Sequence, residues 1–90
     1  MYEDIALKLQ LSPQELAKAS LQLYLNHKLA LVESQLLDLS QKYNVKTVTD
    51  LDHLIQTGQL HEAEAFEDFF EFDHLETERD LLLDLLKEVA

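Results

Sequence analysis

The residue pattern with the most obvious chemistry in this 90-residue chain is Glu-x-x-His, formed by Glu71 and His74. On a helix this spacing places a carboxylate and an imidazole on one face, as in the di-iron sites of helical bundles. Glu33 is a third candidate ligand from another part of the chain. A di-metal (iron) carboxylate bundle, assembled from two copies of the chain, is therefore one alternative hypothesis, and a purely structural helical oligomer is another. We favour an interpretation without a metal, because so acidic a segment produces this spacing by chance and no second such motif exists.

Other catalytic chemistry finds little support in the residue types. The chain has no cysteine, which excludes thiol catalysis and zinc-thiolate sites, and its only glycine is Gly58, so it has no phosphate-binding loop. The four histidines are spread along the chain, and none follows a nucleophile motif. We therefore expect a protein that is not an enzyme and has no cofactor.

Aromatic and acidic residues are concentrated in one segment. All four phenylalanines lie within residues 66–72, inside a stretch, 62–80, that carries nine carboxylates and one arginine. Aromatic rings contribute much contact area, and carboxylates select a basic counterpart. The competing interpretation is an amphipathic helix whose rings are core. The residues predicted to bind a partner are Phe66, Glu67, Asp68, Phe69, Phe70, Glu71, Phe72 and Asp73.

The net charge is distributed unevenly. Residues 1–48 are formally neutral, whereas residues 49–90 carry the whole net charge of −11. The negative electrostatic field of this half repels nucleic acid and anionic membrane surfaces, and it accelerates encounter with a cationic protein. With seven lysines and arginines in total, the sequence argues against autonomous nucleic-acid binding and favours a basic protein partner.

The elements that would position these side chains are helical. Ser12 and Glu15 form a capping box around Pro13, and no helix-breaking residue follows until Asn44. Gly58 ends a second, short helix. We predict an all-α fold in which the long helices pack as an antiparallel hairpin or bundle, with helices at 13–43, 49–57 and 62–89.

The first long helix carries two apolar rows. One has the 4-3 spacing of a coiled coil, and we expect it to drive self-association into a dimer or a larger oligomer. It consists of Leu21, Leu25, Leu29, Val32, Leu36 and Leu39. The other row repeats every seven residues on another side, and comprises Leu16, Leu23, Ala30 and Leu37. Two apolar faces predict more than one neighbouring element.

Residues 5–11 alternate between apolar and polar types, as a strand with one buried face does. A helix is the competing interpretation, because Tyr2, Ile5, Ala6 and Leu9 would share one side of it. The alternation favours a strand, which would pair with a second copy or another protein.

The length is that of a single domain, here residues 1–90. No run of eighteen apolar residues and no secretory leader is present, so we expect a cytoplasmic protein.

Two stretches resemble a known group of proteins. Residues 41–58 read QKYNVKTVTDLDHLIQTG, and residues 66–72 read FEDFFEF before a leucine-rich helix. Together they resemble small helical antitoxin-like proteins of archaeal and cyanobacterial type II toxin–antitoxin modules. The resemblance implies a non-enzymatic binding protein, often dimeric, that masks a toxin such as a small basic ribonuclease. It also implies that the acidic-aromatic segment, residues 66–73, binds the toxin.

Overall fold

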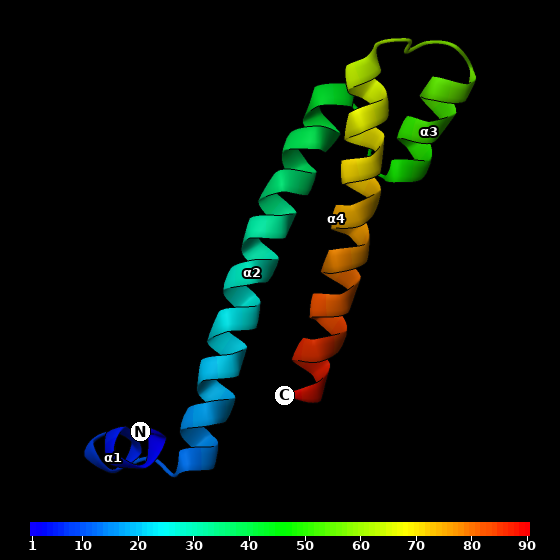
Figure 1. Cartoon of the computed structure of the whole chain (residues 1–90). Coiled ribbons are helices and arrows are strands. Elements are labelled where there is room, and N and C mark those ends of the chain that lie inside the picture. Colours follow the sequence, from blue (N-terminus) through cyan, green and yellow to red (C-terminus); the bar gives the residue numbers. More distant parts are fainter.

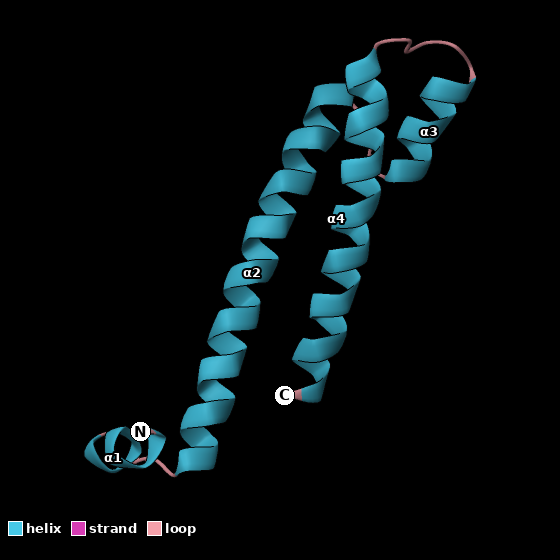
Figure 2. Ribbon diagram, in the orientation of Figure 1, coloured by secondary structure: helices cyan, strands magenta, loops and turns pink.

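A computed structural model describes all 90 residues, and it contains four helices and no strand. The helices are α1 (Tyr2–Lys8), α2 (Pro13–Tyr43), α3 (Val48–Gln56) and α4 (Ala63–Glu88). The two long helices, α2 and α4, lie side by side and antiparallel (Figure 1). The prediction of an all-α fold is confirmed, and the ribbon is helical in every regular segment (Figure 2).

Local capping sets the bounds of α2, as predicted. The Ser12 hydroxyl accepts a hydrogen bond from the Glu15 amide at 3.0 Å, and the Glu15 carboxylate accepts one from the Ser12 amide at 3.3 Å. At the other end Asn44 adopts the left-handed conformation (φ 54°, ψ 47°), and its amide donates to the Ser40 carbonyl. Asparagine tolerates this conformation better than most residues, so the chain turns there.

The short helix α3 begins one residue earlier than the predicted 49–57, because Thr47 is its cap. The Thr47 hydroxyl accepts a hydrogen bond from the Asp50 amide at 3.2 Å. The Val48 amide, free of an intrahelical partner, donates to the Glu76 carboxylate of α4 at 2.9 Å. This contact anchors the amino end of α3 to α4.

The core lies where α2, α3 and α4 meet. Its buried side chains are Leu25, Val32, Leu36, Val45, Leu51, Phe72, Leu75 and Leu82, and Leu29, Leu39, Leu85, Leu86 and Val89 pack against them. The leucines of α4 in and around this core, Leu75, Leu82, Leu85 and Leu86, therefore lie against α2, in agreement with the predicted antiparallel hairpin. The 4-3 row of α2 is filled by α4 of the same chain, so most residues predicted to mediate self-association form the intramolecular seam. Leu21 alone among them is exposed.

The strand predicted at residues 5–11 is wrong, since Tyr2–Lys8 is a helix. Gln10 adopts a positive φ of 60°, and the Leu11 amide donates to the Ala6 carbonyl at 2.8 Å, which closes the end of α1. An isolated strand would have left its backbone groups without partners, whereas the helix satisfies them locally. Ala6 is fully buried, and α1 packs on α2.

The molecule is elongated, with extents of 61 × 19 × 17 Å. The helix α1 lies at one end, beside the amino end of α2, and α3 lies at the other end with the amino end of α4 (Figure 1). None of the helices combines the length and the apolar character needed to cross a membrane.

Candidate functional site: an aromatic and acidic surface on α4

Phe66 and Phe70 lie one helical turn apart on the outer face of α4, and both rings are exposed. Phe66 is 45% and Phe70 is 69% exposed. The Phe70 ring meets the half-buried Phe69 edge-on, with ring centroids 5.3 Å apart and an interplanar angle of 73°. Phe69 in turn packs against the core, so it holds the Phe70 ring against the helix.

The phenylalanines therefore divide between two roles. Phe72 is only 1% exposed and is the largest fully buried side chain, together with Leu51 of α3. At about 100° per residue, Phe69 and Phe72 face α2 and α3, whereas Phe66 and Phe70 face outward. Both sequence interpretations of the aromatic segment thus describe part of it. Of the four phenylalanines in the folded chain, only Phe66 and Phe70 offer exposed rings to a partner.

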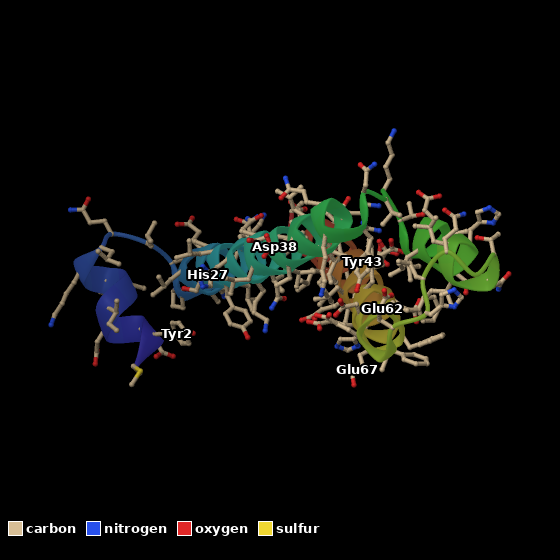
Figure 3. The ribbon with its side chains drawn as sticks, turned by 90° about the horizontal axis from the view of Figure 1, so that it is seen from above. Tyr2, His27, Asp38, Tyr43, Glu62 and Glu67 are labelled. Atoms are coloured by element: carbon tan, nitrogen blue, oxygen red, sulfur yellow. The ribbon has the colours of Figure 1, made fainter.

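Carboxylates surround the two exposed rings. Glu67, Glu71 and Asp73 are exposed, and none of them forms an ion pair within the chain. Glu62 and Glu67 lie at the amino end of α4, with Glu67 on the side turned away from α2 (Figure 3). We call Phe66, Phe70 and these acids (Glu62, Glu67, Glu71 and Asp73) the aromatic-acidic surface. Its charges are free to pair with cations of another molecule.

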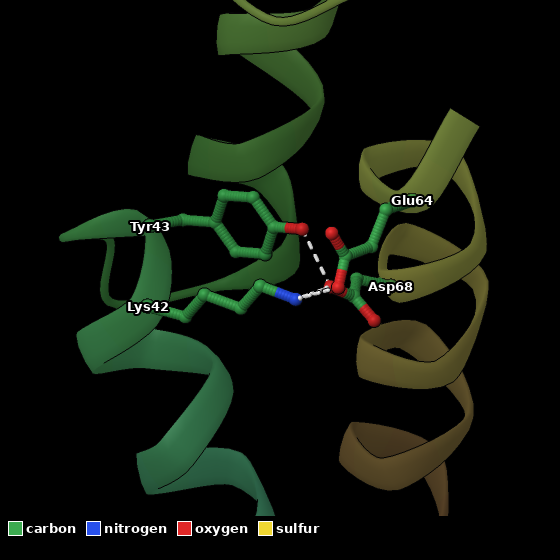
Figure 4. Close-up of polar contacts among 4 residues, drawn as sticks. All are labelled: Lys42, Tyr43, Glu64 and Asp68. Carbon is green, nitrogen blue, oxygen red and sulfur yellow. Dashed lines mark hydrogen bonds and ion pairs between the residues drawn. The ribbon is translucent and has the colours of Figure 1, made fainter. Parts of the chain in front are cut away.

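Asp68, also predicted to bind a partner, is engaged inside the chain. Its carboxylate accepts hydrogen bonds from the Lys42 ammonium at 2.7 Å and the Tyr43 hydroxyl at 2.5 Å. The same ammonium donates to Glu64 at 2.6 Å. The cluster of Lys42, Tyr43, Glu64 and Asp68 joins the end of α2 to the start of α4 (Figure 4). It fixes the helix that carries the aromatic-acidic surface.

These contacts shift the protonation equilibria of the cluster. Burial raises the pKa of Tyr43 to about 12, and its hydrogen bond to Asp68 acts in the same direction. Burial alone would raise the pKa of Asp68, but the hydrogen bonds from Lys42 and Tyr43 outweigh it and hold the pKa below the ordinary 3.8. Hydrogen bonds to Asp68 and Glu64 raise the pKa of Lys42 above its ordinary value. At neutral pH Lys42 is therefore charged, Tyr43 is neutral and Asp68 is a carboxylate.

Comparison with known proteins places the whole chain in one family. The model of the MJ0235 family, described as an uncharacterized protein family, matches residues 1–90. The chain belongs to the MJ0235 family. No curated protein and no solved structure matches it. The family description assigns no activity, so the function of this MJ0235-family protein has to be inferred from its own residues.

The metal ligands considered from the sequence are not brought together in this MJ0235-family chain. No three histidine, aspartate or glutamate side chains form a group that could hold a metal ion. The nearest acidic partner of His74 is Glu78, at 3.9 Å, whereas Glu33 lies on α2 and lines a hollow with Arg79. Glu71 and His74 do share an exposed stretch of α4. Glu71, His74 and Glu33 therefore do not come together within one chain, whereas the cage considered from the sequence would use two copies.

Sequence reasoning missed the roles of Lys42 and Tyr43. Both lie in the last turn of α2, where a cation is favoured by the helix dipole. The sequence did contain a signal for this ion pair. Lys42 is one of only seven basic residues, and the predicted antiparallel arrangement brings the end of α2 to the acidic start of α4. This MJ0235-family protein thus uses a cation near the acidic segment for its own fold, and leaves Glu67, Glu71 and Asp73 without an ion pair.

Proposed function

We propose that this protein is a non-catalytic, antitoxin-like module that binds a small basic protein through its aromatic-acidic surface. The observation that supports the proposal is the pair of exposed rings, Phe66 and Phe70, among carboxylates without intramolecular partners. A Phe ring that remains 69% exposed gains considerable free energy when a partner covers it. The resemblance of residues 41–58 and 66–72 to antitoxin-like proteins supports the same conclusion.

The two kinds of side chain have separate tasks in this proposal. Phe66 and Phe70 provide most of the affinity, because rings at the centre of an interface exclude water from their neighbours. The carboxylates Glu67, Glu71 and Asp73 accelerate encounter with a cationic surface, and their effect weakens as salt screens them. The partner is then a small basic protein such as a ribonuclease, whose cationic RNA-binding surface the acids would cover.

The rings can be removed without disturbing the fold, which makes the proposal testable. We expect a small basic protein to copurify stoichiometrically with the tagged wild type from its native cell at modest salt, and to elute at high salt. Phe70→Ala should weaken that complex about 30-fold, the equivalent of about 2 kcal/mol for an interface hot spot. Isothermal titration with the isolated partner measures the change.

The matched control is Leu81→Ala. Leu81 is also exposed on α4 but lies outside the aromatic-acidic surface, so its truncation should leave the affinity unchanged. In a growth assay, the wild type should relieve the toxicity of the partner, and a variant with both Phe66→Ala and Phe70→Ala should not. Equal affinity of wild type and the double variant would refute the proposed surface.

A further inference from the structure

The exposed apolar side chains of this protein are concentrated at the amino-terminal end. Of the fifteen large apolar side chains that are exposed, eleven lie in the first 37 residues. Those on α2 are Leu21, Leu23, Tyr24, Leu31 and Leu37. Scattered exposed leucines need no explanation, but a group of this size on one part of a surface marks a contact site.

One side of α2 is predominantly apolar, and Asp38, near the end of the helix, is its one Asp or Glu residue. At about 100° per residue, the outer face of α2 points away from the core and comprises Leu16, Leu23, Tyr24, Ala30, Leu31 and Leu37. The other charged residues of this stretch point elsewhere. The Lys28 ammonium lies 4.0 Å from Glu78 of α4, and Glu33 lines a hollow with Arg79 of α4. Lys18 precedes the buried Leu25 by seven residues, on the same side of the helix.

The helix α1 extends this apolar surface. It leaves the amino end of α2 on the side away from α4 (Figure 1), and it exposes Tyr2, Ile5 and Leu7. The α4 helix cannot cover this end, because its last residues lie beside the third turn of α2. The Gln22 side-chain amide donates to the Val89 carbonyl there, at 3.0 Å. The amino end of α2 therefore projects past the end of α4, and α1 packs against α2 there (Figure 1).

The solvent-accessible surface area of the chain is larger than that of a typical monomer of the same mass. One chain exposes 6631 Å², whereas a typical monomer of this mass exposes about 5,400 Å². The excess is roughly 1,200 Å² per chain, so a pair that covers it would bury roughly 2,400 Å², within the range of permanent homodimers. The radius of gyration, 18.8 Å, also exceeds the value of about 12 Å for a globular chain of 90 residues.

We propose that the outer face of α2, together with α1, is the interface of a homodimer in which the same surface of two copies meets. The composition of this face favours a second copy over a basic partner here, because Asp38 at its carboxy-terminal end is the one carboxylate that it offers to a cation. A dimer formed through this face also keeps the acidic halves of the two copies apart. Residues 1–48 are formally neutral, so two copies can meet through them while the −11 carried by residues 49–90 of each remains outside. This interface differs from the 4-3 row predicted from the sequence.

The mass in solution tests the proposal. In sedimentation equilibrium from micromolar to hundred-micromolar protein, the wild type should have close to twice the chain mass of 10.4 kDa. Leu23→Glu combined with Leu31→Glu should halve that mass and leave the helical circular dichroism unchanged, because both side chains are exposed within one chain. Leu81→Glu is the matched control, an equally exposed leucine on α4. It should remain a dimer, as should Phe70→Ala.

A second measurement does not depend on a disruptive substitution. The chain lacks cysteine, so Ala30→Cys introduces a single thiol at the centre of the outer face. That thiol should react with a maleimide several-fold more slowly in concentrated than in very dilute protein, whereas the thiol of Glu67→Cys should react equally in both. A wild-type mass of one chain throughout, a dimeric Leu23→Glu/Leu31→Glu variant, or equal reactivity of Ala30→Cys at both concentrations would each overturn the proposal. None of these outcomes bears on partner binding by Phe66 and Phe70.

Discussion

Phe72→Ala should lower the free energy of unfolding by about 3–5 kcal/mol, the usual loss for truncating a buried phenylalanine. The Phe72 ring is 1% exposed and belongs to the cluster that joins α2, α3 and α4. Only ten residues of the chain are buried, so few other contacts can compensate. A loss of this size is a large share of the total stability of about 5–15 kcal/mol of ordinary domains. Urea denaturation followed by circular dichroism measures it.

Phe70→Ala is the control for this prediction, since it makes the same chemical change two residues earlier. Its ring is mostly exposed, so we expect a change within about 0.5 kcal/mol. Equal destabilisation by the two substitutions would contradict the assignment of Phe72 to the core and of Phe70 to the surface. The same pair separates stability from binding, because the Phe70 substitution should affect the partner complex while the fold remains intact.

Asp68→Ala should lower the free energy of unfolding by about 1–3 kcal/mol. The substitution leaves the partly buried Tyr43 hydroxyl and the Lys42 ammonium without their shared acceptor. Glu64→Ala is the matched control. Glu64 contacts the same ammonium, but its side chain is largely exposed, so the loss should stay below about 1 kcal/mol. A similar loss for both variants would show that the buried hydrogen bond from Tyr43 contributes nothing.

The contribution of Asp68 should also depend on pH. Its pKa in the folded chain lies below the ordinary 3.8, so the folded state binds fewer protons at this group than the unfolded state does. The stabilisation is therefore complete above pH 3.8 and is lost as the pH falls through the lower pKa of the folded state. The stability difference between wild type and Asp68→Ala should shrink on acidification below pH 3.8. A constant difference down to pH 2 would contradict the depressed pKa.

The features predicted correctly from the sequence are those that neighbouring residues determine. The Ser12 capping box, the left-handed Asn44 and the end of α3 near Gly58 each depend on a few adjacent residues. The prediction for residues 5–11 failed, because their alternation of apolar and polar residues fits both a strand and one face of a helix. The helix α1 ends at Lys8, and Gln10 two residues later adopts a positive φ; nothing in the sequence marks glutamine for that conformation.

The division of the four phenylalanines could not be read from the sequence alone. Helical spacing separates Phe66 and Phe70 from Phe72, but it does not say which side meets another element. The answer depends on α3, which packs on α4 and is anchored to it by Glu76. The same limitation applied to α2. Both of its apolar rows were recognised, but only the three-dimensional arrangement showed that α4 fills the 4-3 row.

The elongated shape gives this protein two distant points of attachment. The aromatic-acidic surface lies at the amino end of α4, and α1 lies at the opposite end of a molecule 61 Å long (Figure 1). A dimer joined through α1 and α2 would thus display two identical docking sites on stiff helical arms. Such a particle is bivalent. A partner that is itself paired would be held at both sites by avidity, and would dissociate far more slowly than either contact alone allows.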